Sequence, residues 1–218
     1  MSTSMTARIA AFETKAAAEF PAEAMAVFGG ERRFQGAKAP LNLPALGTAM
    51  PDGDLLDAHG KATTLASARA GKPAVVVFYR GAWCPYCNVT LRAYQEDLLP
   101  ELTARGIALV AISPQKPDGA LTAQETNELS YAVLSDPGNQ IAGALGILTE
   151  TGEAAVAVQA QLGLVVADTN ADGTAAIPMP TVVVLDAGGA IRWIDVHPDY
   201  GTRTEPTEVL KRVVDVAR

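Results

Sequence analysis

The sequence predicts an α/β domain in which helices cover both faces of a central sheet. Three observations lead to this fold class. Short segments rich in β-branched residues alternate with segments whose apolar residues recur at helical spacing. The strongest of the short segments, 74–79, is apolar throughout, as strands buried on both faces are. Near the end of the chain, two strands joined by a turn at Gly188-Gly189 form a hairpin, and a last helix follows.

An N-terminal helical extension precedes the domain. A first helix reaches Pro21, which ends it, and a second, short helix ends at Gly29-Gly30. The first helix carries an apolar stripe, a candidate core face or homodimer contact, formed by Ile9, Phe12, Ala16 and Phe20. Prolines mark the segment 36–51 as an extended connection. We therefore assign residues 1–49 to the extension with its connection, and 50–218 to the α/β domain.

The elements of the domain follow in order. Residues 57–60 form the turn of a small hairpin, and the strand at 74–79 leads into a helix from near Cys84 to about Arg105. That helix buries a stripe made of Leu91, Tyr94, Leu98 and Leu102. The segment 147–177 is an insertion with a short helix around 154–161. The other expected elements are strands at 107–113, 131–134, 181–186 and 191–196, and helices at 122–128, 139–145 and 206–217.

Composition excludes several classes of function. The chain has 17 basic and 24 acidic residues, a net charge of -7, which argues against binding to nucleic acid. No apolar run approaches the roughly 18 residues that a membrane-spanning helix needs. Glu13, Lys15 and Glu19 interrupt every candidate secretory signal. We therefore expect a cytoplasmic protein without membrane contacts, in a compartment where thiols stay reduced.

The two cysteines, Cys84 and Cys87, form a CxxC motif where a buried strand gives way to a helix. The free N–H groups and the positive end of a helix favour thiolate over thiol, and the thiolate is the reactive species. Two intervening residues place the sulfurs within reach of a disulfide, so that one cysteine can attack and the other can resolve the product. The sequence thus predicts a dithiol redox centre at an exposed helix start.

Two other readings of the motif remain open. Zinc requires four ligands, and with no second CxxC in the chain, His59 and His197 would have to complete the site from distant turns. Free cysteines are also common as inert core residues. The strand-to-helix position favours the redox interpretation over both. No cofactor and no metal is predicted.

The string FYRGAWCPYCN resembles the active-site segment of the peroxiredoxin-like branch of the thioredoxin superfamily, the alkyl hydroperoxide reductase/thiol-specific antioxidant group. The resemblance continues in VAISPQ at 110–115, in VLSDPGNQIAGALGI at 133–147 and in PMPTVVVLDAGGAIRWIDVHPDYGTRTEP at 178–206. It covers about residues 50–218, in the family's order. The N-terminal extension lies outside it.

The resemblance implies a thioredoxin-like fold with a mixed sheet. The implied strand order is 131–134, 107–113, 74–79, 181–186, 191–196, and the last two strands break the parallel pattern. The resemblance also implies a cis peptide bond at Met179-Pro180, facing the CxxC across the active-site groove. The dipeptide alone does not, because only about 5% of X-Pro bonds are cis.

The chain departs from the P-x-x-x-T-x-x-C pattern of a typical peroxiredoxin. On that pattern Arg80 replaces the proline, Cys84 replaces the threonine, and Cys87 is the peroxide-attacking cysteine. Thioredoxin-type proteins attack with the first cysteine, here Cys84, so the order stays open. The arginine that polarises the peroxide is absent near Met179-Pro180 in the sequence. Arg80 could supply the missing charge, or it could be an ordinary strand-end cation.

These features predict Cys84 and Cys87 as catalytic, with Arg80, Trp83, Tyr86 and Pro180 around the substrate. The first hypothesis is a thiol-dependent antioxidant enzyme that reduces hydroperoxides and is recycled by an external thiol such as thioredoxin or glutathione. The second is a protein-disulfide oxidoreductase in which Cys84 attacks. A third is a redox-sensing module without enzymatic activity.

Overall fold

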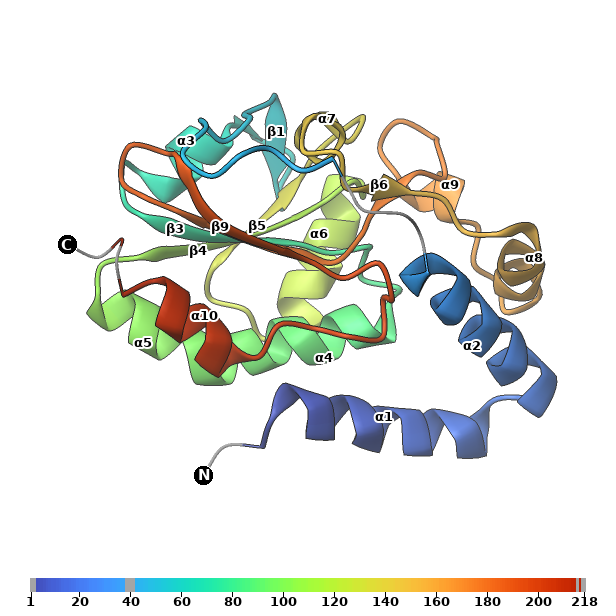
Figure 1. Cartoon of the computed structure of the whole chain (residues 1–218). Helices are drawn as coiled ribbons and strands as arrows, with labels where there is room; N and C mark the ends of the chain where they lie inside the picture. Colours follow the sequence, from blue (N-terminus) through green and yellow to red (C-terminus); the bar gives the residue numbers. More distant parts are fainter. Residues whose placement is uncertain (1–2, 38–41, 215, 217–218) are drawn as a thin grey trace.

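A mixed sheet lies between two layers of helices in the computed structural model, which describes residues 3–37, 42–214 and 216 (Figure 1). Within those residues the strand order is β2-β1-β5-β4-β3-β8-β9. The strands are β1 (Leu55–Asp57), β2 (Ala62–Thr63), β3 (Ala74–Phe78), β4 (Ala108–Ser113), β5 (Ala132–Ser135), β8 (Thr181–Leu185) and β9 (Ile191–Val196). The order expected for the five central strands is confirmed, and the small hairpin β1–β2 extends the sheet beside β5.

Strand β3 is the centre of the sheet and is buried along its whole length. It runs parallel to β4 and antiparallel to β8, with Val76 opposite Val110 and Val183. Alternate side chains serve different cores: Val75 and Val77 belong to one buried cluster and Val76 to the other. This double burial is why the strand is apolar at every position.

Helices pack on both faces of the sheet. The cluster that contains the cysteines is formed with α4 (Pro85–Ala93), α5 (Leu99–Ala104), α6 (Pro117–Thr126) and α10 (Pro206–Arg212). The opposite cluster is formed with α3 (Leu65–Arg69) and α7 (Gln140–Ala144). The predicted stripe at 91, 94, 98 and 102 is fully buried. No helix within the described residues is long and apolar enough to span a membrane.

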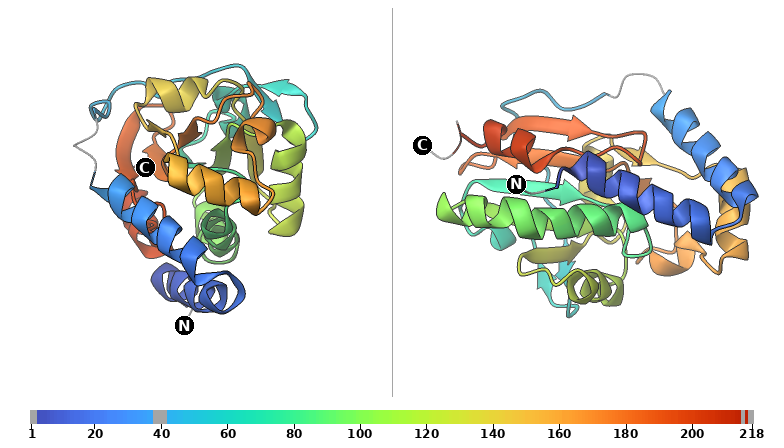
Figure 2. Two further views of the ribbon diagram at one scale, coloured as in Figure 1. Left: turned by 90° about the vertical axis from the view of Figure 1, so that its right-hand side faces the viewer. Right: turned by 90° about the horizontal axis from the view of Figure 1, so that it is seen from below.

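The N-terminal extension folds back onto the domain as α1 (Met5–Glu19) and α2 (Ala22–Gly36). Helix α1 lies beside α4, and α2 lies beside α8 (Glu153–Gln161) of the insertion (Figure 2). The expected end of the second helix at Gly29-Gly30 is wrong. Glycine costs about 1 kcal/mol within a helix, and contacts beyond it, such as the Gln35 amide donating to the Glu150 carbonyl at 2.8 Å, favour continuation.

The insertion is bracketed by a strand pair, β6 (Leu148–Thr149) with β7 (Ile177–Pro178), and also contains α9 (Val166–Thr169). The helix predicted within it is present as α8. Helix α6 begins at Pro117, earlier than expected, because proline suits a first helical turn. Part of the proline-rich connection and the end of the last predicted helix lie outside the described residues.

Candidate active site

The CxxC motif occupies the first turn of α4, directly after the loop that follows β3. Cys84 is the N-cap residue and Pro85 fills the first helical position, where its missing N–H is not needed. The Cys87 N–H donates to the Cys84 carbonyl at 3.0 Å, which closes the turn. A Cβ at Gly81, earlier in the loop, would overlap the Trp83 indole, so glycine lets that ring lie over the loop.

Both thiols are free and buried, each 1% exposed, which corrects the expected exposed helix start. They belong to the core cluster between the sheet, α1 and α4. The physical reason is that the N-terminal extension and the loop after β9 pack over a helix end that would otherwise meet solvent. An oxidant must therefore reach the sulfurs through this cover.

Arg203 brings a cation into contact with one of the two thiols. Its Nη2 donates to the Cys87 sulfur at 3.5 Å. Arg203 lies in the loop after β9, and the sequence offered no spacing that would connect it to the CxxC. Arg203 thus brings a guanidinium to the CxxC motif, although no arginine lies near Met179-Pro180 in the sequence.

The two thiols differ in acidity. Burial raises the pKa of Cys87, but a hydrogen bond from Cys84, the charge of Arg203 and a backbone hydrogen bond from Arg80 outweigh it, so the pKa falls to about 5. Burial and the hydrogen bond to Cys87 hold the pKa of Cys84 well above its usual value. The arrangement therefore favours a Cys87 thiolate beside a Cys84 thiol.

The structure places Arg80 beside the thiols, 5% exposed, with its guanidinium 4.0 Å from the Tyr200 ring centre and 5.1 Å from that of Trp83. Such stacking stabilises a cation that has little access to water. Tyr86 is half-buried, and its hydroxyl meets Arg32 and Glu13 of the extension. The predicted residues around the CxxC therefore lie together, but Tyr86 is turned toward the N-terminal helices.

Pro180 lies across from α4 and lines a small cavity with Cys87, Arg203 and His197. The cavity volume is about 10 Å³, roughly the room that one water molecule needs. A much larger open hollow of about 1130 Å³, between the β8–β9 turn and α10, is lined by neither cysteine. The space at the Cys87 sulfur is therefore about the size of one water molecule.

The expected cis bond at Met179-Pro180 is wrong, since the described residues contain no cis peptide bond. The trans form is the intrinsic preference of an X-Pro bond by about 0.5–1 kcal/mol. Here it lets the chain pass from β7, through the Met179 N–H donating to Ile147 at 2.8 Å, directly into β8.

The other sequence interpretations were a zinc site and an inert pair. No three His, Cys, Asp or Glu side chains are grouped as metal ligands in the described segments. His197, which would have been a ligand, instead contacts Thr202, Thr204 and Asp195. An inert pair is difficult to reconcile with the Arg203 contact at one sulfur.

Comparison with known proteins relates this chain to one family, through a family model and through similar sequences. The model of the AhpC/TSA family matches residues 46–194. The similar proteins include putative peroxiredoxins from two organisms. One, from Mycobacterium tuberculosis, is 33% identical over 48% of this chain and 65% of its own length. The other, from Haemophilus influenzae, is 32% identical over 50% of this chain and 70% of its own length.

Solved structures share the fold. Peroxidoxin BcpB from Mycobacterium tuberculosis superposes with a TM-score of 0.59 at 19% identity, over 78% of this chain and 97% of that one. Thiol peroxidase from Chromobacterium violaceum gives a TM-score of 0.60 at 16% identity, over 83% and 93%. These values show a common architecture. Arg32 and Arg203 both lie outside the family match.

Proposed function

The chain belongs to the AhpC/TSA family, a peroxiredoxin-like group of the thioredoxin superfamily, and on that premise we propose that it is a thiol-dependent hydroperoxide reductase. In this proposal Cys87 attacks the peroxide and Cys84 resolves the product. The observation that carries the assignment is the Arg203 guanidinium 3.5 Å from the Cys87 sulfur, together with the low pKa of that thiol.

The proposed cycle has three steps. The Cys87 thiolate attacks one oxygen of the O–O bond, that bond breaks, and the other oxygen leaves as an alkoxide or hydroxide that takes a proton. The Cys84 sulfur then attacks the Cys87 sulfenic acid, which forms the disulfide and releases water. Two electrons and two protons from an external thiol, such as thioredoxin or glutathione, restore both thiols. A reducing compartment such as the cytoplasm suits this cycle.

Arg203 and Arg80 have distinct roles in the proposal. Arg203 stabilises the thiolate and the charge that develops on the leaving oxygen, because it contacts the Cys87 sulfur and lines the small cavity beside it. Arg80, whose guanidinium stacks on the Trp83 and Tyr200 rings, adds a second positive charge near the thiols. Pro180 forms the opposite wall of the space that the peroxide enters.

A protein-disulfide oxidoreductase that attacks with Cys84 is the second candidate. It would need a Cys84 thiolate open to a protein partner. The raised pKa of Cys84 and the burial of its side chain weigh against this. A sensor without catalytic turnover would show the same first oxidation but no recycling.

The test is stopped-flow tryptophan fluorescence of the reduced protein mixed with hydrogen peroxide, since Trp83 lies beside the thiols. Wild type is compared with Cys84→Ser, whose hydroxyl still donates a hydrogen bond, and with Cys87→Ser. We expect fast oxidation in wild type and Cys84→Ser, with the latter stopping at a sulfenic acid that dimedone traps. Cys87→Ser reacts no faster than a free thiol.

The opposite pattern, with fast oxidation in Cys87→Ser alone, would sink the proposed order of attack. Fast insulin reduction without peroxide reduction would favour the disulfide oxidoreductase. Oxidation that neither thioredoxin nor glutathione reverses would favour the sensor.

A further inference from the structure

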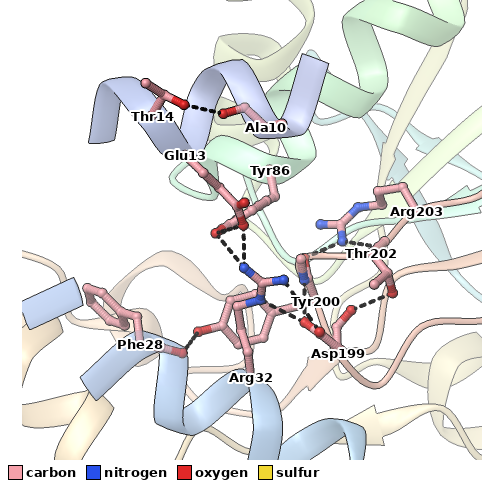
Figure 3. A network of polar contacts seen from close by, with 11 residues as sticks. Ala10, Glu13, Thr14, Phe28, Arg32, Tyr86, Asp199, Tyr200, Thr202 and Arg203 are labelled. Carbon is pink, nitrogen blue, oxygen red and sulfur yellow. Dashed lines mark hydrogen bonds and ion pairs between the residues drawn. The ribbon is translucent and has the colours of Figure 1, made fainter. Parts of the chain in front are cut away.

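Arg32 of the N-terminal extension joins two parts of the active site that are far apart in the sequence (Figure 3). From α2, it forms an ion pair with Glu13 of α1 and donates to the Tyr86 hydroxyl at 3.1 Å. Its Nε and Nη2 donate to the Asp199 carboxylate at 2.8 and 3.4 Å. One guanidinium thus contacts the CxxC segment and the loop that follows β9.

The Tyr86 contact fixes the first turn of α4. Tyr86 lies between the two cysteines, and its hydroxyl accepts from Arg32 and donates to Glu13 at 3.1 Å. Its ring packs edge-on against Phe12, with ring centres 5.0 Å apart, and against Tyr200 at 6.0 Å. Because Tyr86 and Cys87 are neighbours in the first turn of α4, a shift of this ring would also displace Cys87.

The Asp199 contact fixes the loop that carries Arg203. The Asp199 carboxylate also accepts the Gly201 N–H at 2.8 Å, and its carbonyl accepts the Thr202 N–H at 2.9 Å. The Arg203 guanidinium donates to the carbonyls of Tyr200 and Thr202 in the same loop. Asp199 is therefore the base of a compact turn whose geometry aims Arg203 at the Cys87 sulfur.

Gly201 leaves the space that the Arg32 guanidinium occupies. A Cβ on Gly201 would overlap the guanidinium carbon of Arg32. Gly201 is absent from the glycines with a left-handed backbone, so alanine suits the backbone there and only the space forbids it. The planar fork of arginine offers two parallel donors to Asp199 and leaves Nη1 for Glu13 and Tyr86, whereas a lysine ammonium is a single point charge.

We propose that Arg32 is a positioning residue for the peroxidase centre and that the helices α1 and α2 are part of the active site. Arg32 holds Tyr86 and the Asp199 loop in one arrangement, and through them sets Arg203 against Cys87. Arg32 has no contact with either sulfur, and Glu13 and Asp199 neutralise its charge. The role assigned to Arg203 rests on the function proposed above.

The test measures the pH dependence of Cys87 ionisation in the full chain, followed by the ultraviolet absorbance of the thiolate and taken as the difference from Cys87→Ser. In Arg32→Gln we expect the midpoint to rise by about one pH unit, as loss of a well-placed charge partner does. The rate of peroxide reduction then falls several-fold at pH 5, while it changes little at pH 8. Arg33→Gln, an exposed neighbour on the same helix, is the matched control and keeps the wild-type midpoint.

Gly201→Ala displaces Arg32 without removing a charge, so it should raise the midpoint as Arg32→Gln does. If it acts through Arg32, the double variant shows no further shift beyond that of Arg32→Gln alone. Tyr86→Phe keeps the ring but removes the hydroxyl, and we expect it to raise the midpoint as well. This variant replaces Arg32→Gln in the test if Arg32→Gln does not fold.

A wild-type midpoint in folded Arg32→Gln, or additive shifts in the double variant, would overturn the proposal. The ionisation of Cys87 is measured without turnover. If the variants shift its midpoint as expected but the wild type does not reduce peroxide, the proposed function fails and the positioning role of Arg32 stands.

Discussion

At the scale of single residues, the acidity of Cys87 depends on which groups the fold brings to its sulfur. A thiol 1% exposed would ordinarily stay protonated, because burial disfavours the thiolate. Arg203 at 3.5 Å and the hydrogen bond from Cys84 reverse that preference. Burial and the hydrogen bond to Cys87 keep Cys84 protonated, in line with the resolving role proposed for it.

Replacing Arg203 tests the electrostatic part of this account. In Arg203→Gln the thiolate loses its cation, so we expect the pKa of Cys87 to rise by about one to three units. The rate of reaction with hydrogen peroxide falls most between pH 5 and 7 and approaches wild type as the pH exceeds the new pKa. Arg203→Lys keeps the charge and should recover part of the loss.

Arg105→Gln is the control, because Arg105 lies at the end of α5 and pairs with Glu101 of that helix. An Arg203→Gln profile that superposes on wild type across this pH range would contradict the role of Arg203.

At the scale of elements, the helix expected over 84–105 is continuous in space but changes pitch. A π-helical segment, η1 (Tyr94–Leu98), separates α4 from α5. Pro100 has no N–H to donate to the carbonyl four residues earlier, and its ring repels that carbonyl. The wider turn, with the Leu99 N–H donating to Tyr94, relieves the conflict. Tyr94 then donates to the Thr204 carbonyl at 2.8 Å, next to Arg203.

Helix α1 is anchored at its start by a side chain from the other end of the chain. The Glu205 carboxylate accepts the N–H groups of Met5 and Thr6, at 2.8 and 3.0 Å, and the Thr6 hydroxyl at 2.9 Å. These N–H groups have no partner within the helix, and a negative charge there also matches the helix dipole. The same residue precedes α10, so it ties two elements together.

We therefore expect Glu205→Ala to lower the free energy of unfolding by about 1–2 kcal/mol, the usual effect of losing a helix cap and a favourable dipole contact. Urea unfolding followed by circular dichroism measures it. Glu208→Ala is the matched control, because that half-buried carboxylate pairs with Lys211 and Arg212 of its own helix. Equal effects of the two substitutions would show that the anchor contributes nothing of its own.

At the scale of the whole molecule, the site is assembled from segments that never meet in the sequence. The CxxC, the entry to β8, the loop after β9 and the N-terminal helices converge on one end of the sheet. The extension therefore has two effects in the structure: it buries the thiols, and it adds polar contacts to both the turn and the loop that surround them.

The buried thiolate also makes global stability depend on pH. An unfolded cysteine has a pKa of about 8.5, whereas that of Cys87 in the folded chain is about 5. Between these values the unfolded chain binds one proton more, so stability rises with pH by up to about 1.4 kcal/mol per pH unit. The gain is complete above the unfolded pKa and is lost as the pH falls through about 5.

Urea unfolding of the reduced protein from pH 5 to 8 should show this rise, measured as the difference from Cys87→Ser at each pH so that other titrating groups cancel. A difference that stays constant across the range would mean that Cys87 is not ionised in the folded chain.

Local patterns determined much of this protein. The uninterrupted apolar run at 74–79 predicts the central strand, the spacing of Leu91, Tyr94, Leu98 and Leu102 predicts the buried helix face, and both are confirmed. The position of Cys84 and Cys87 at a strand-to-helix junction is visible in the sequence for the same reason. Periodicity and turn chemistry act over a few residues, so neighbours in the chain record them.

Only the tertiary structure decided how the thiols are placed. Arg203 is 116 residues from Cys87, and Arg32 is 167 residues from Asp199. No period links such partners, because their approach depends on the summed packing of every element between them. The same packing buries both cysteines, carries α2 past Gly29-Gly30 and leaves Met179-Pro180 trans. The sequence alone indicated a dithiol centre, and through-space charge and burial determined which of its two sulfurs is the acidic one.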